Sequence, residues 1–162
     1  MERRIGSVAV PPPGEHVAAV KKHHFVARPL YPPAFPIMGI TYTLDRGRHR
    51  MYTRAEGRLT LPELLEHLRV EEIDRAEGYA ELFDARGATT DVRAEDIRRL
   101  VDRTRELQAA GRIVGPTAIV ADNDVVFGMA RMYAILSEFV NAPVEVYRDV
   151  PPALEWLDHV SP

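Results

Sequence analysis

From residue 37 onward, runs of strand length alternate with segments whose apolar residues recur at helical spacing, and this alternation limits the chain to few folds. Two strand-like runs come first, at residues 37–44 and 48–56, and the turn between them contains Gly47, a residue suited to positive φ. Strands joined by a tight turn run antiparallel, whereas strands joined through helices run parallel. The pattern therefore predicts a mixed sheet, with an opening hairpin followed by β-α units.

Four helices are predicted, each from its own sequence signal. The first opens with Thr60 and Glu63, the polar pair of a capping box. The second has one apolar stripe, the third is apolar nearly all round, and the fourth is opened by two prolines. The helices are expected at residues 60–74, 94–110 and 125–140 and in a short segment after residue 150. The remaining strands are expected at residues 79–84, 116–121 and 144–147, with a loop at 86–91.

Three local strings accompany this element order: Gly57-Arg58-Leu59 before Thr60, the helical Gly128 to Tyr133, and Val146 to Asp149 leading into Ala153 to Leu157. Together with the element order, these strings resemble the SpoIIAA-like class, which contains the STAS domains of anti-sigma-factor antagonists and anion transporters. The resemblance covers about residues 38–158 and points to an uncharacterised bacterial branch of the class. It implies an α/β domain over residues 37–160, with a mixed five-stranded sheet and about four helices.

Residues 1–36 form a segment of different character, with prolines at positions 11–13, 29, 32, 33 and 36. Each proline removes a backbone donor and disfavours helix at the residue before it. We expect an extended, Pro-rich tail. Three interpretations stay open: a docking peptide, an unstructured extension, or a segment that translation from Met38 would omit.

Composition and motifs exclude several classes of function. The net charge of −3 gives no general attraction to nucleic acid, and no apolar run reaches the length of a membrane span. The chain has no cysteine, its histidines lack ligand spacing, and no glycine-rich nucleotide loop occurs, so we expect neither metal nor cofactor. A response-regulator receiver needs a lysine near the end of its last strand. No lysine follows Lys22 in this sequence, so the receiver class is rejected. A cytoplasmic location is the expectation.

Four residues are candidate ligand-binding positions. Arg86 follows a predicted parallel strand, at the edge where open α/β sheets bind ligands, and Asp84 ends that strand and can orient it. The alternative is a solvated ion pair. Arg131 lies in an apolar helix, and two interpretations stay open. One is a site for a carboxylate or phosphate, and the other is a position at the helix edge, where Arg131 pairs with Glu138 or extends to water. Tyr133, on the same helix, belongs either to the core or to an apolar pocket.

The resemblance also implies a phosphorylation switch, which this sequence does not support. Phosphorylated STAS proteins carry an Asp-Ser-Ser/Thr-Gly-like string where the second helix begins. Here residues 84–96 contain no serine, and Thr89 and Thr90 are the only hydroxyls. We therefore do not expect phosphorylation at either threonine, and no catalytic residue is assigned.

Three functions follow in order of preference. The first is a non-catalytic regulatory or interaction module, which forms a homodimer or binds a protein partner. The second is a carrier of a small anionic amphiphile or lipid, with Arg86 or Arg131 at its head and the apolar helix along its tail. The third is an enzyme of unknown chemistry.

Overall fold

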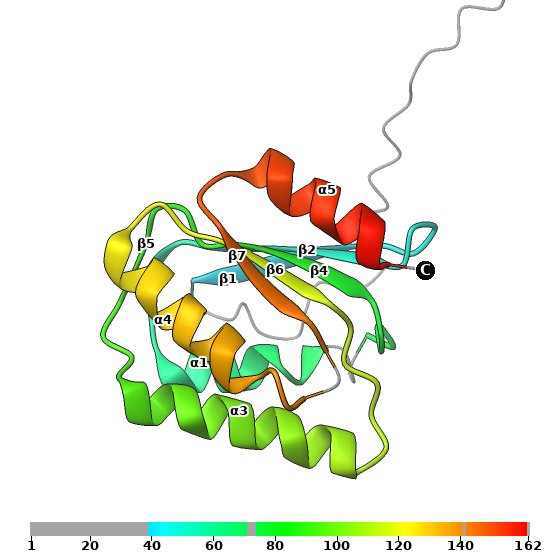
Figure 1. Cartoon of the computed structure of the whole chain (residues 1–162), viewed down its shortest axis with the longest axis horizontal. Coiled ribbons are helices and arrows are strands. Elements are labelled where there is room, and N and C mark those ends of the chain that lie inside the picture. Colours follow the sequence, from blue (N-terminus) through cyan, green and yellow to red (C-terminus); the bar gives the residue numbers. More distant parts are fainter. Residues whose placement is uncertain (1–38, 71–73, 141, 162) are drawn as a thin grey trace, which may run out of the picture.

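The computed structural model describes residues 39–70, 74–140 and 142–161, so the predicted tail at residues 1–36 and Met38 lie outside the described residues. The main sheet has the strand order β1-β2-β4-β6-β7 (Figure 1). β1 pairs antiparallel with β2, and the other three pairs are parallel. The predicted mixed five-stranded sheet with an opening hairpin is therefore confirmed. The strands are β1 (Ile40–Asp45), β2 (Arg50–Ala55), β4 (Ala80–Asp84), β6 (Thr117–Val120) and β7 (Val144–Tyr147).

Helices cover both faces of the sheet (Figure 1). One face carries α1 (Leu61–His67), α3 (Ala94–Ala109) and α4 (Asp124–Leu136), and the opposite face carries α5 (Val150–Val160). α5 lies directly on β4, β6 and β7. α3 packs chiefly against α1 and α4, so these two helices separate it from the sheet. The layers on the two faces are therefore built differently.

The helix starts follow the sequence signals. Thr60 caps α1, and the Glu63 carboxylate accepts the backbone N–H of Thr60 at 2.8 Å, which completes the predicted capping box. Asn123 caps α4, its side-chain oxygen accepting the N–H of Val125 at 2.8 Å. Prolines occupy the first turn of α5, where their missing N–H groups cost nothing.

Two predicted helices end earlier than expected. α1 stops at His67 instead of continuing to about residue 74, and α4 stops at Leu136 instead of residue 140. In both places the next turn tightens. The N–H of Arg69 bonds to the carbonyl three residues back at 3.0 Å, and the N–H of Val140 does the same at 2.8 Å. Bonds of this spacing close an α-helix as a 3₁₀-type turn.

Two predictions about the connections are wrong. The residue with positive φ in the hairpin turn is His49, at φ 48°, and not Gly47. The expected loop at 86–91 contains the strand β5 (Ala88–Thr90), which pairs parallel with β3 (Gly57–Leu59) in a second, two-stranded sheet. Gly57, at φ 72°, bends the chain out of β2 and so starts β3 as a separate strand.

Candidate functional site

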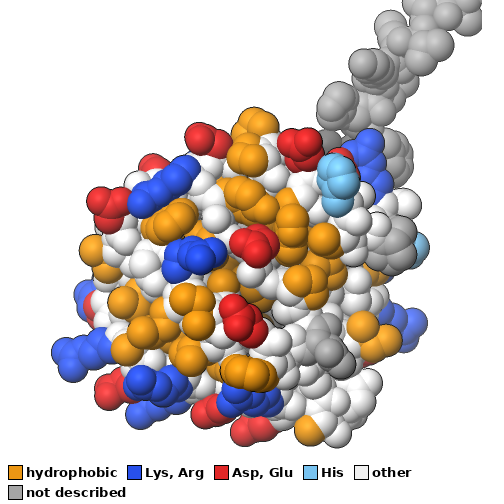
Figure 2. All heavy atoms as spheres, in the orientation of Figure 1, with side chains coloured by type: hydrophobic (Ala, Val, Ile, Leu, Met, Phe, Trp, Pro, Cys, Tyr) orange, Lys and Arg blue, Asp and Glu red, His pale blue; other side chains and the backbone are white. Residues whose placement is uncertain are grey.

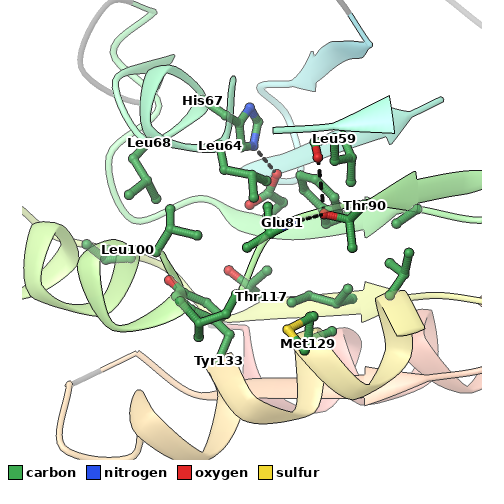
Figure 3. Close-up of a pocket in the computed structure, with 18 residues that line it drawn as sticks. Leu59, Leu64, His67, Leu68, Glu81, Thr90, Leu100, Thr117, Met129 and Tyr133 are labelled. Atoms are coloured by element: carbon green, nitrogen blue, oxygen red, sulfur yellow. Dashed lines mark hydrogen bonds and ion pairs between the residues drawn. The ribbon is translucent and has the colours of Figure 1, made fainter. Parts of the chain in front are cut away.

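A cavity of about 120 Å³ lies between the main sheet and the three-helix layer. Its lining is largely apolar. The strands and all three of these helices contribute side chains, including Leu64 of α1, Leu100 of α3 and Met129 of α4 (Figure 3). The position follows from the packing, because α3 rests on its neighbouring helices and not on the strands. The cavity therefore lies where α1 and α4 separate α3 from the strands.

Three buried polar side chains meet at the sheet side of this cavity. Glu81 Oε1 lies 2.7 Å from Nε2 of His67 and 2.5 Å from Oγ1 of Thr53. The exposed fractions of Thr53, His67 and Glu81 are 2%, 5% and 7%, so the group is almost fully withdrawn from bulk water. His67 and Glu81 line the cavity itself (Figure 3).

The local structure explains why these side chains converge. Glu81 lies on β4 two residues before Phe83, and strand alternation turns both toward the helical layer. Thr53 is the register partner of Phe83 on β2, so it faces the same way. His67 is the last residue of α1, and its ring packs edge-on against Phe83 with centroids 5.4 Å apart. The strand β4, its neighbour β2 and the end of α1 thus supply one residue each.

The hydrogen bonds of this group are unevenly distributed. Both donors, the Thr53 hydroxyl and the His67 Nε2–H, reach the same oxygen of Glu81. Among the described residues, no hydrogen bond reaches Oε2 of Glu81, and His67 Nδ1 is buried without a partner. Burying a carboxylate is costly unless its oxygens are bonded. The group therefore retains an acceptor capacity that the described chain does not use.

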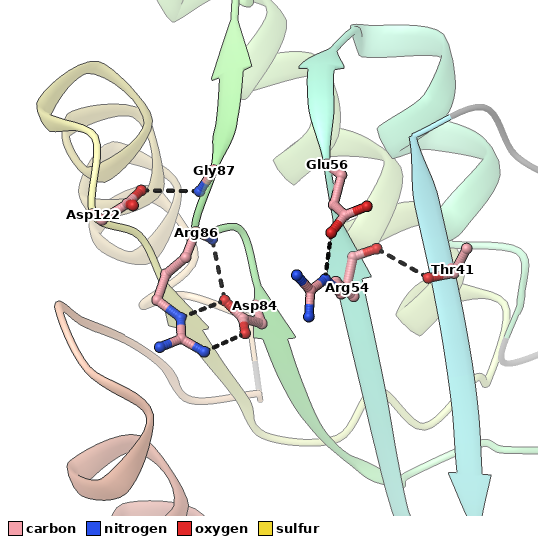
Figure 4. Close-up of polar contacts among 7 residues, drawn as sticks. All are labelled: Thr41, Arg54, Glu56, Asp84, Arg86, Gly87 and Asp122. Atoms are coloured by element: carbon pink, nitrogen blue, oxygen red, sulfur yellow. Dashed lines mark hydrogen bonds and ion pairs between the residues drawn. The ribbon is translucent and has the colours of Figure 1, made fainter.

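Asp84 and Arg86 lie together at the carboxyl end of β4, outside the cavity (Figure 4). The Arg86 guanidinium donates to both carboxylate oxygens of Asp84, at 2.9 and 2.7 Å. This bonding lowers the pKa of Asp84 from its ordinary value and raises that of Arg86. The backbone N–H of Gly87 donates to Asp122 at 3.1 Å and fixes the adjoining turn. The Arg86 side chain is 44% exposed, as in a solvated surface pair.

Arg131 and Tyr133 lie on α4 but belong to different surroundings. Arg131 pairs with Glu145 of β7 at 3.8 Å, not with the predicted Glu138, and both side chains are about half exposed. Tyr133 lines the cavity, and its hydroxyl lies 3.3 Å from Oγ1 of Thr104. The sequence candidates therefore do not form one site.

The threonines considered for phosphorylation lie in β5. The Thr90 hydroxyl donates to the carbonyl of Leu59 at 3.1 Å and accepts the N–H of Val92 at 3.0 Å, so its bonds hold β5 beside β3. Thr89 is exposed, and its hydroxyl lies 3.5 Å from the carbonyl of Gly57. Both hydroxyls therefore contact backbone carbonyls of β3.

Sequence reasoning missed the buried polar group. His67 was set aside with the other histidines because no ligand spacing accompanies it. Glu81 did carry a signal, since it is a single acid inside the otherwise apolar run of a central strand, and acids are rarely buried there without a partner. Thr53 gave none, because threonine is ordinary in strands.

Neither a metal-binding cluster nor a membrane-spanning helix occurs among the described residues. These residues hold no group of three or more histidine, aspartate or glutamate side chains that could bind a metal ion. Within the same ranges, every helix is too short or too polar to cross a membrane.

Comparison with known proteins gives a likeness in fold. No family model matches the chain, and no curated protein matches it. Among solved structures, it is similar to a protein from Shewanella loihica described as an uncharacterized protein from the DUF3478 family with a SpoIIAA-like fold. The two are 18% identical, with 74% of this chain and 94% of that chain covered and a TM-score of 0.48. The likeness is one of fold.

Proposed function

We propose that the chain binds a small, mainly apolar molecule in the cavity beneath the main sheet. The observation that carries the proposal is a hollow of about 120 Å³ between the main sheet and the helices on one of its faces. Protein interiors pack as densely as organic crystals, and voids larger than a water molecule are few. An apolar pocket with a small number of convergent polar groups is the usual form of a small-molecule site.

The lining supports this kind of ligand more than the anionic amphiphile expected from the sequence. Among the described residues, neither Arg86 nor Arg131 lines the cavity. The walls can bury an apolar body, and the carboxylate of Glu81 can fix one polar end. We propose binding alone and assign no reaction to the His67–Glu81 pair.

Filling the cavity tests the proposal. Ala130 lines the cavity and is 8% exposed, so Ala130→Leu places three further carbons in the hollow. We expect toluene, titrated into the full chain and followed by NMR chemical shifts, to bind the natural chain and to lose at least about tenfold in affinity with Ala130→Leu. Gly128→Ala is the matched control on the same helix, because a Cβ there meets nothing within 4 Å. Toluene binding that is absent, or unchanged by Ala130→Leu, would contradict the proposal.

A protein-interaction role is the second candidate, and exposed apolar residues near the end of α4 support it. Ile135 is 53% exposed and Phe139 is 87% exposed. Figure 2 shows hydrophobic side chains gathered among charged ones on one face of the molecule. The partner proposed is a second copy of the chain, which buries this apolar surface. Light scattering after size exclusion should show a dimer that Phe139→Glu dissociates, whereas Ile113→Glu, at another position that is 66% exposed, should not.

A further inference from the structure

The cavity wall has a charge that selects among small apolar molecules. Among the described lining residues, Glu81 is the one acid, and neither lysine nor arginine is present. The basic side chain in the described lining is His67, whose Nε2 lies 2.7 Å from Oε1 of Glu81. An anionic head group would therefore meet no fixed positive charge in the described lining.

The unused acceptor of Glu81 has a defined position. Thr53 and His67 occupy Oε1, which leaves Oε2 without a donor among the described residues. Glu81 is 7% exposed, so bulk water reaches this carboxylate poorly. A ligand that brings a donor to this oxygen adds a hydrogen bond to a carboxylate whose other oxygen is already bonded. A charged donor gives the stronger hydrogen bond.

We propose that the ligand is a small apolar primary amine whose ammonium group donates to Oε2 of Glu81. This inference rests on the proposed function and names the ligand class of the same cavity. The ammonium carries three donors, and Thr117, the register neighbour of Glu81 on β6, adds a hydroxyl to the lining. The carboxylate compensates for the desolvation of the cation, and the apolar walls bury the rest of the molecule.

The size of the cavity limits the apolar body. A cavity of about 150 Å³ lined by aliphatic and aromatic side chains holds one benzene ring. This cavity, at about 120 Å³, is of the same order. The ligand is therefore a molecule with one ring or a short branched chain, and not a long-chain lipid.

Three probes that share a phenyl ring separate the contribution of the head group from that of the body. Benzylamine, benzyl alcohol and benzoate are titrated into the full chain at neutral pH and about 0.15 M salt, where the Debye length is about 8 Å and the net charge of the chain is largely screened. Benzylamine should bind at least about tenfold more tightly than benzyl alcohol, and benzoate should bind most weakly. Glu81→Gln should remove the preference for the amine. Glu106→Gln, at a side chain that is 66% exposed, should keep it.

The outcomes distinguish this inference from the function on which it rests. Benzoate binding as tightly as benzylamine, or an unchanged preference in Glu81→Gln, overturns the amine assignment, while toluene binding would still support a site for apolar molecules. Failure of toluene and of all three probes removes both. If Glu81→Gln does not fold, the ranking of the probes on the natural chain decides, because that measurement needs no variant.

Discussion

The two faces of the main sheet are covered in different ways, and the difference locates the candidate site. On one face, α5 lies directly across the central strands, and Ala118, Ala153 and Leu157 are fully buried. On the other, α3 is held away from the strands by α1 and α4, and the cavity lies beneath it. A helix with small contact residues can approach a sheet closely, whereas a helix that rests on two others cannot fill the space over the central strands.

Each face also holds a buried charge, and the two charges are treated differently. Arg50, 5% exposed, reaches outward to Asp158 at 2.7 Å, and that carboxylate is itself 68% exposed. Glu81 remains inside, where its partners are His67 and Thr53. The guanidinium of Arg50 is therefore paired with a carboxylate that is exposed to solvent at the edge of α5. The second faces a cavity, which makes it available to a ligand.

Removing one leucine from each face should give the largest contrast. Leu157→Ala leaves a void in a fully packed layer, so we expect a loss of about 2–5 kcal/mol in the free energy of unfolding. Leu100 already borders the cavity. Leu100→Ala should therefore cost less, at most about 2 kcal/mol, because fewer contacts are lost. Urea denaturation of both variants measures the difference, and equal losses would mean that the two layers are packed alike.

Adding the same carbons to each face should produce effects of opposite sign. Ala153→Leu overfills the α5 layer and should destabilise the chain by about 1–3 kcal/mol. Ala130→Leu fills the cavity and should stabilise it by about 0.5–2 kcal/mol. Alanine and leucine have similar helix propensities, so packing dominates both results. Thermal unfolding is the measurement, and a destabilising Ala130→Leu would show that the hollow cannot accept side-chain atoms.

Thr53→Val examines the polar group beneath the cavity without changing the shape of the side chain greatly. The variant removes the donor that lies 2.5 Å from Glu81 and leaves His67 in place. We expect a loss of about 1 kcal/mol. Thr41→Val is the control, since Thr41 is exposed and its hydroxyl lies 3.5 Å from its acceptor, the carbonyl of Arg54 (Figure 4). Equal losses in both variants, measured by urea denaturation, would argue against a special role for the buried group.

The sequence predicted the strands of the main sheet and the start of α1 well, because strand patterns and helix caps are local signals. The apolar run that became β6 and the capping box at Thr60 and Glu63 are signals of this kind. β5 was missed because a strand of three residues with two threonines has no periodicity to detect, and its pairing with β3 is long-range.

The candidate site was harder to predict than the fold. Asp84 and Arg86 are two residues apart, so their pairing could be anticipated from the sequence. His67 and Glu81 meet only because α1 ends beside β4, at the position of Glu81. The cavity itself depends on the distance of α3 from the strands, and no pattern within α3 encodes that distance.

Asp84 and Arg86 lie at the carboxyl end of β4, away from both helical layers. Breaking their ion pair should have the smallest effect on the free energy of unfolding. Hydrogen bonding from Arg86 lowers the pKa of Asp84 in the folded chain, although desolvation acts against it. A lowered folded pKa means that the stabilisation is complete above the ordinary value of about 3.9 and is lost as the pH falls through the folded value. Asp84→Asn should cost about 0.2–1 kcal/mol at neutral pH, as exposed ion pairs do, and less at pH 2. Urea denaturation at both pH values measures this. A larger neutral-pH loss than in Thr53→Val would place the more important polar contact at the sheet edge, and not beneath the cavity.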